Sequence, residues 1–193
     1  GLMPFDSKLR DAMVAQDTMY TLWEKGVSSS HVRVMGCHQK FILAPEDPEA
    51  AVAALSAPTT KVATMTLTEK GYFINFITGD PLLDAGPVKD AITLLKGLGM
   101  GKLAAGRGLK TAAGYLVCAS KRRIAAGSPG FTVLSCDNVQ ENGEKAEKAI
   151  LQMARAVDPS VADWMHRNVT FPNSMVDRIT PATTDEFKAQ LAD

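Results

Sequence analysis

Apolar residues in this chain follow helix-like spacing in some segments and strand-like runs in others, and the two kinds of segment alternate. The clearest helix pattern follows Gly143, where apolar residues recur at the three- and four-residue spacing of a single helix face. These residues are Ala146, Ala149, Ile150, Met153, Ala154 and Val157. Alternation of helices with short apolar strands predicts a protein of the α/β class.

The remaining elements are predicted from the same patterns and from turn and cap residues. Strands are expected at residues 20–24, 31–43, 61–68, 131–134 and 169–171. Helices are expected at residues 6–16, 47–55 and 87–126, with a break at the glycines between 97 and 108, and then after 143, after 158 and after 183. Asp47-Pro48 and Asp158-Pro159 each combine an N-cap with a proline at the first helical position, and Thr183 with Glu186 matches a capping box. Neither a repeat nor a low-complexity linker interrupts the pattern, so one domain is expected.

The composition narrows the range of partners. The chain has 193 residues, of which 46% are apolar and 22% are charged, as in ordinary globular proteins. Lys plus Arg and Asp plus Glu both number 21, so the net charge gives no reason to expect nucleic acid or an anionic membrane as the partner. The longest apolar run, near residues 112–119, is too short to span a bilayer.

The cysteines and histidines argue against a disulfide framework and against a metal site. Cys37, Cys118 and Cys136 are far apart in the sequence and form no C-x-x-C pair. They are therefore interpreted as reduced thiols, which predicts the cytoplasm or another reducing compartment. The three histidines show no metal-ligand spacing, and no metal is expected.

Two apolar runs end abruptly in polar residues, and these ends are the candidate site. Residues 131–134 lead into Ser135-Cys136-Asp137-Asn138, and residues 169–171 lead into a polar run that contains Asp177. In open α/β sheets, ligands bind beyond the carboxyl ends of the strands. Asn138 there could donate a hydrogen bond to an oxygen that becomes an alkoxide, or it could cap a turn. Asn142 is more simply explained as the cap of the helix that follows.

Three acidic residues have two interpretations each on residue type alone. Asp177 could bind a polyol hydroxyl, or it could pair with Arg178 at the surface. Asp6 could bind the ribose hydroxyls of a dinucleotide, or it could cap the first helix. Glu69 follows a predicted strand end and could belong to a site, or it could form a solvated pair with Lys70.

The motifs at the two strand ends carry a family resemblance. Ser135-Cys136-Asp137-Asn138 with Asn142-Gly143, followed by Phe-Pro-Asn-Ser-Met-Val-Asp-Arg-Ile-Thr-Pro at residues 171–181, resembles the polyol-specific long-chain dehydrogenases, the mannitol dehydrogenase family. Shorter matches at residues 44–50 and 66–72 extend the resemblance over nearly the whole chain, with the weakest stretch at about 81–110. The resemblance implies metal-free hydride transfer between NAD(P) and a polyol or sugar acid.

The resemblance also implies roles for single residues. Asp6 matches the acid that selects NAD through its ribose, and Thr66 and Glu69 match positions that line the coenzyme cleft. Asn138 matches an amide that holds the reacting oxygen of the substrate, and Asp177 matches a carboxylate at the substrate and nicotinamide end. Phe5 stands where the family often has an acid, which keeps NADP open as the alternative coenzyme.

Two parts of the family pattern have no counterpart in residues 1–193. These are the first strand with its Gly-rich phosphate loop, and the helical C-terminal domain with the catalytic lysine. We therefore expect an incomplete doubly wound Rossmann sheet at residues 1–181, with residues 182–193 starting a helix that leads out of the domain. Another chain or a missing segment would complete the sheet, because open inner edges invite pairing. The rival interpretation is a non-catalytic descendant that serves as a structural subunit of a larger assembly.

Overall fold

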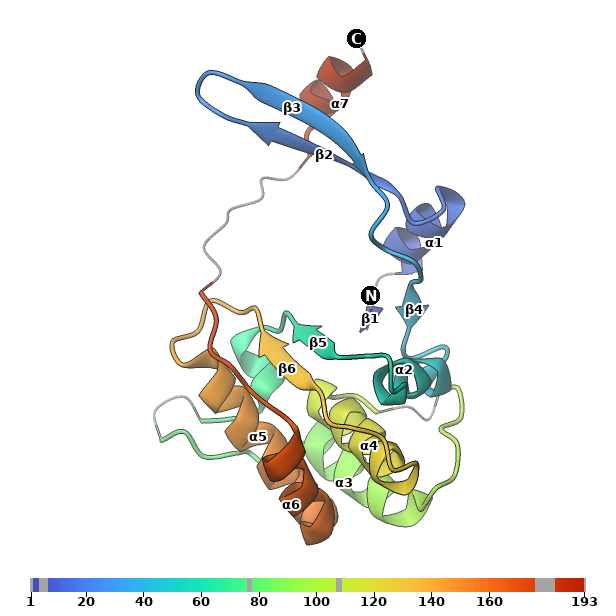
Figure 1. Cartoon of the computed structure of the whole chain (residues 1–193), viewed down its shortest axis with the longest axis vertical. Helices are drawn as coiled ribbons and strands as arrows, with labels where there is room; N and C mark the ends of the chain where they lie inside the picture. The colour runs from blue at the N-terminus through green and yellow to red at the C-terminus, as the bar shows by residue number, and fades with distance from the viewer. Residues whose placement is uncertain (1, 4–6, 76–77, 107–108, 176–182, 193) are drawn as a thin grey trace.

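The computed structural model describes residues 2–3, 7–75, 78–106, 109–175 and 183–192 (Figure 1). Its elements confirm the predicted α/β class. The strands are β1 (Leu2–Met3), β2 (Tyr20–Lys25), β3 (Ser30–Met35), β4 (Ile42–Leu43), β5 (Val62–Met65) and β6 (Thr132–Ser135). The helices are α1 (Ser7–Ala15), α2 (Pro48–Ser56), the 3-10 helix η1 (Glu69–Tyr72), α3 (Gly86–Leu98), α4 (Ala112–Ala125), α5 (Asn142–Val157), α6 (Pro159–Asn168) and α7 (Asp185–Ala192).

The core forms where strands β5 and β6 pair in parallel under the longer helices. Their register joins Val62 to Thr132 and Met65 to Ser135, and Thr170 adds a single parallel bridge beside Thr132. Val133, in the middle of β6, is fully buried. Helices α3, α4, α5 and α6 gather beside this pair in Figure 1, and α5 is buried along the apolar face predicted from its spacing. Of the strand predicted at residues 169–171, only Thr170 forms a bridge, to Thr132.

A second region is built from the strands near the N-terminus. β1 pairs in parallel with β4 as a separate two-stranded sheet, and β2 pairs with β3 as an antiparallel hairpin. The hairpin extends away from the core, and α7 lies against it (Figure 1). The Phe187 ring meets the Trp23 ring edge-on at 6.2 Å, and the Lys25 Nζ atom lies 3.6 Å from the centre of the Trp23 ring.

The single strand predicted at residues 31–43 is wrong. β3 ends at Met35, and the chain enters β4 at Ile42 after residues 36–41, which belong to neither strand. The Thr18 hydroxyl donates to the His38 carbonyl in this segment, and the Tyr20 ring stacks on the His38 ring at 5.2 Å. Apolar spacing alone does not reveal this interruption, since both halves have strand-like composition.

Side-chain caps confirm two of the predicted helix starts. Asp47 accepts a hydrogen bond from the Ala50 amide at 2.9 Å, and Asp158 accepts one from the Ser160 amide at 2.9 Å. The last helix is capped by the Thr184 hydroxyl, which accepts from the Phe187 amide, so the predicted cap at Thr183 is one residue early.

One buried cation joins helix α4 to the end of α2 and to the loop that precedes β6. Arg123 is fully buried in α4, and its guanidinium donates to the carbonyls of Leu55, Ala57, Thr60 and Pro129 at 2.7–3.1 Å. The first three carbonyls belong to the end of α2 and the turn after it. This arginine therefore satisfies carbonyls at the end of a neighbouring helix.

Candidate functional site

The carboxyl ends of β5 and β6 emerge side by side. The Cys136 amide donates to the Met65 carbonyl at 2.7 Å, which continues the ladder one step beyond the paired strands. Thr66 and Asn138 follow at this edge, and both are exposed. The structure thus brings together two of the predicted site residues at the place where an open parallel sheet binds ligands.

A buried carboxylate ties the two strand ends together. Asp137 is 6% exposed, and its Oδ1 atom accepts a hydrogen bond from the Leu67 amide at 2.5 Å. Its Oδ2 atom accepts from the Tyr72 hydroxyl and from the Ser135 hydroxyl, the latter at 3.2 Å. Burial, and secondarily the hydrogen bond to Asp137, raises the pKa of the Tyr72 phenol, so this hydroxyl remains a donor at neutral pH.

Asn142 is a buried connector, and its predicted role as the cap of α5 is wrong. It is fully buried as the first residue of α5. Its amide nitrogen lies 3.0–3.3 Å from the carbonyl oxygens of Ser135, Asp137 and Ser174, and its oxygen accepts from the Ser174 amide at 2.9 Å. One side chain thereby joins the end of β6 to the segment at residues 171–174.

The cap of α5 comes from a different part of the chain. The Asn173 Oδ1 atom accepts from the Gly143 amide at 2.9 Å and from the Glu144 amide at 3.3 Å. A Cβ atom at Gly143 would lie 2.5 Å from the Phe171 and Pro172 carbonyl oxygens, so only glycine allows this close approach. Sequence reasoning missed Asn173 because its partners lie 29 and 30 residues away.

The other predicted site residues are placed less fully. Glu69 begins η1, directly after this edge, but the description of the structure does not include its side chain. Asp6 and Asp177 lie outside the described residues. Their predicted roles in coenzyme and substrate binding therefore stay predictions.

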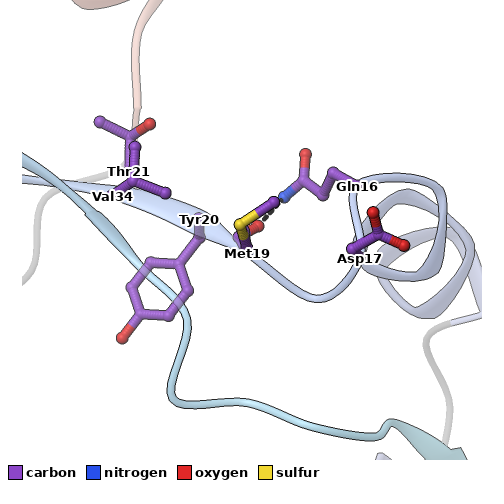
Figure 2. A pocket seen from close by; sticks show the side chains of 6 residues that line it. All are labelled: Gln16, Asp17, Met19, Tyr20, Thr21 and Val34. Atoms are coloured by element: carbon purple, nitrogen blue, oxygen red, sulfur yellow. Dashed lines mark hydrogen bonds between the residues drawn. The ribbon is translucent and has the colours of Figure 1, made fainter.

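Two hollows of the surface lie away from this edge. One, of about 290 Å³, is beside the hairpin, and in Figure 2 the Gln16 amide reaches back to the Met19 carbonyl across part of its wall. Its lining residues are Gln16, Asp17, Met19, Tyr20, Thr21 and Val34. A second of the same volume lies over α5 and α6. Neither of these two hollows is lined by Thr66 or Asn138.

The three cysteines are not paired with one another. Cys37 is exposed, Cys118 is buried and Cys136 is partly buried. In the part of the chain that the structure describes, no group of three or more His, Cys, Asp or Glu side chains is arranged to hold a metal ion. Within the same residues, no helix is both long enough and apolar enough to cross a bilayer.

Comparison with known proteins gives consistent matches. The family model described as the mannitol dehydrogenase Rossmann domain matches residues 2–193. A mannitol 2-dehydrogenase of Phaeosphaeria nodorum is 41% identical over 99% of this chain and 32% of its own length. A polyol:NADP oxidoreductase of Gluconobacter oxydans is 43% identical over 95% of this chain and 36% of its own length.

A solved structure agrees in fold. Mannitol 2-dehydrogenase of Pseudomonas fluorescens, in a ternary complex with NAD and D-mannitol, superposes with a TM-score of 0.84 and 34% identity. The match covers 95% of this chain and 35% of that protein. The chain thus spans about a third of the length of the curated relatives that it matches.

Proposed function

Because the chain belongs to the mannitol dehydrogenase family, whose Rossmann-domain model matches residues 2–193, we propose that it is the coenzyme-binding part of an NAD(P)-dependent polyol dehydrogenase. The observation that carries the proposal is the joined carboxyl edge of β5 and β6, with Thr66 and Asn138 exposed on it. The relatives include both a polyol:NADP oxidoreductase and a protein solved with NAD, so the choice of coenzyme is an outcome of the test.

The β5–β6 edge has the chemistry that a nicotinamide coenzyme and a polyol require. Its exposed side chains Thr66 and Asn138 are uncharged and can both donate and accept hydrogen bonds. The one carboxylate that the structure describes beside them, Asp137, already accepts three internal hydrogen bonds and is withdrawn from solvent. A bound nicotinamide would supply the hydride acceptor at this edge.

We assign the roles of residues as follows. Asn138 donates to the substrate oxygen while the carbinol carbon loses a hydride and the hydroxyl loses its proton, so that a ketone forms. The base for that proton is expected in the helical C-terminal domain of the family, and the proposed reaction needs no metal. Thr66 and Glu69 line the coenzyme side, Asp6 binds the coenzyme ribose, and Asp177 orients the polyol.

We also propose that one further strand completes the sheet. Among the described residues, β1–β4 and β5–β6 are separate two-stranded sheets, and Val62 on β5 is 51% exposed. A doubly wound fold places a central strand between two such halves, paired in parallel with both. Another segment of the natural protein, or a second chain, would supply it. Residues 1–181 would then form the coenzyme domain, with residues 182–193 leading out of it.

The test uses the protein at its full natural length. Oxidation of D-mannitol with NAD⁺ and with NADP⁺ is followed by the absorbance of the reduced coenzyme. We expect turnover with at least one coenzyme, and Asn138→Ala should lower kcat/KM about 100-fold, as loss of one oxyanion donor does. Asn168→Ala removes another exposed asparagine, on α6, and should leave kcat/KM unchanged.

Absence of turnover with any polyol or keto sugar, together with no stabilisation by NADH or NADPH, would contradict the proposal. That pair of results would instead support the rival interpretation, a non-catalytic structural subunit. Turnover that is unaffected by Asn138→Ala would overturn only the role of that residue.

A further inference from the structure

We infer that Asp137 and Tyr72 form a positioning pair that fixes the coenzyme-side loop, residues 66–72, against the β6 strand end, and thereby sets the affinity for the nicotinamide coenzyme. The inference deepens the proposed function and rests on it. It concerns two buried residues to which the proposed reaction gives no role.

The two carboxylate oxygens of Asp137 hold the coenzyme-side loop at two points. The carboxylate of Asp137 reaches across from β6 and holds the Leu67 amide with one oxygen and the Tyr72 hydroxyl with the other. Leu67 lies two residues beyond β5, and Tyr72 ends η1. The loop is thus held at both its start and its end by the two oxygens of a single side chain.

The orientation of the peptide between Thr66 and Leu67 follows from its planarity. A trans peptide points its N–H and its C=O in opposite directions. Because the Leu67 N–H points at buried Asp137, the Thr66 carbonyl of the same peptide must point away from it. Thr66 is exposed. The hydrogen bond to Asp137 therefore turns the Thr66 carbonyl toward the edge, where hydroxyl or carboxamide donors of a coenzyme could reach it.

Asp137 also holds the backbone next to Asn138, just beyond the end of β6. The Asp137 carbonyl accepts from the Val139 amide at 2.8 Å and from the Asn142 side chain at 3.0 Å. The residues on both sides of exposed Asn138 are thereby fixed. One residue connects the coenzyme-side loop with the proposed substrate-side amide.

The hydrogen-bond donors around Asp137 explain why a carboxylate is needed at this position. Three donors converge on Asp137, and only a carboxylate offers acceptors alone. In the ion pairs that the structure records for its described residues, Asp137 has no cationic partner. A buried carboxylate without a cation is costly, and here its hydrogen bonds hold a loop in one orientation.

The test compares two buried tyrosines in the full-length protein. Tyr72 is 5% exposed and donates to Asp137, whereas Tyr115 is 7% exposed and donates to the Ala44 carbonyl at 3.3 Å. Each Tyr→Phe change removes one buried hydroxyl and leaves the ring in place. Dissociation constants for NADH and NADPH are measured by fluorescence titration, and hydrogen exchange reports on residues 66–72.

Tyr72→Phe should raise the Kd of the coenzyme that binds about tenfold, which corresponds to about 1.4 kcal/mol. It should also speed exchange at residues 66–72, while KM for the polyol changes less than about twofold. Asp137→Asn should act in the same direction. Tyr115→Phe should leave both Kd and the exchange of residues 66–72 near the wild-type values.

A Kd unchanged by Tyr72→Phe, or raised equally by Tyr115→Phe, would overturn the inference and leave the proposed function standing. A wild-type protein that binds neither coenzyme would overturn both. The two failures are thereby distinguished, because the first appears only in the variants and the second already in the wild type.

Discussion

Asn138, which follows β6, and Asn142, which begins α5, should differ in how far mutation lowers stability, and Asn142→Ala is the more informative change. Asn142 is fully buried, and its side chain contacts the backbone of Ser135, Asp137 and Ser174. The Ser135 and Asp137 carbonyls keep other donors in the variant, from the Ser174 hydroxyl and the Val139 amide. The main loss therefore falls on the Ser174 backbone.

The size of the effect follows from these contacts. Two backbone groups that lose their partner at partly buried Ser174 cost about 1–3 kcal/mol each. The higher helix propensity of alanine recovers no more than about 0.7 kcal/mol. The expected loss in the free energy of unfolding is therefore about 3 kcal/mol for Asn142→Ala. Asn138 is exposed, so Asn138→Ala should change this free energy by less than about 0.5 kcal/mol.

Urea denaturation of this chain, followed by circular dichroism, measures both variants. A loss of about 3 kcal/mol corresponds to a fall in the midpoint of about 1–2 M, and the midpoint of Asn138→Ala should stay at the wild-type value. Equal midpoints for the two variants would refute the reasoning. They would mean that the buried amide does not hold the β6 end to residues 171–174.

Three further changes test other parts of the structure. Arg123→Met removes the donors to four carbonyls and should lower the free energy of unfolding by about 3 kcal/mol or more in urea denaturation; a loss below about 1 kcal/mol would contradict its role. Gly143→Ala would bring a Cβ atom within 2.5 Å of two carbonyl oxygens and should cost about 1–3 kcal/mol. Gly97→Ala, in open space within α3, is the matched control and should be neutral or stabilising. Burial raises the pKa of Tyr115 to about 12, so above pH 10 the unfolded chain loses this proton first and stability falls. Tyr115→Phe should make that fall shallower, by at most about 1.4 kcal/mol per pH unit; an unchanged slope would contradict the shift.

Local patterns were sufficient to predict most of the elements. The spacing after Gly143 predicted the buried face of α5, and Asp47 and Asp158 were identified as caps because a cap and its helix are adjacent in sequence. The glycine-rich stretch correctly separated α3 from α4. The predicted strands at residues 61–68 and 131–134 end within a few residues of the observed ends at 65 and 135, and this was sufficient to locate the candidate edge.

Contacts between distant segments could not be predicted in the same way. Asn173 caps a helix whose donor amides lie 29 and 30 residues earlier, and the pairing of Asp137 with Leu67 spans 70 residues. Spacing rules describe neighbours along one element, so they assigned Asn142 to a local cap. The family resemblance identified the motifs at residues 135–143 and 171–181. The structure shows that Asn142 and Asn173 of these motifs hold the two segments together.

The central claim is that the carboxyl edge of β5 and β6 binds a nicotinamide coenzyme. Hydrogen exchange of the full-length protein with and without saturating NADH or NADPH tests it most directly. The account predicts slower exchange at residues 66–72 and 136–142, with no change in the hairpin at residues 20–35. Protection confined to the hairpin, or bound coenzyme that leaves both strand ends unprotected, would contradict it.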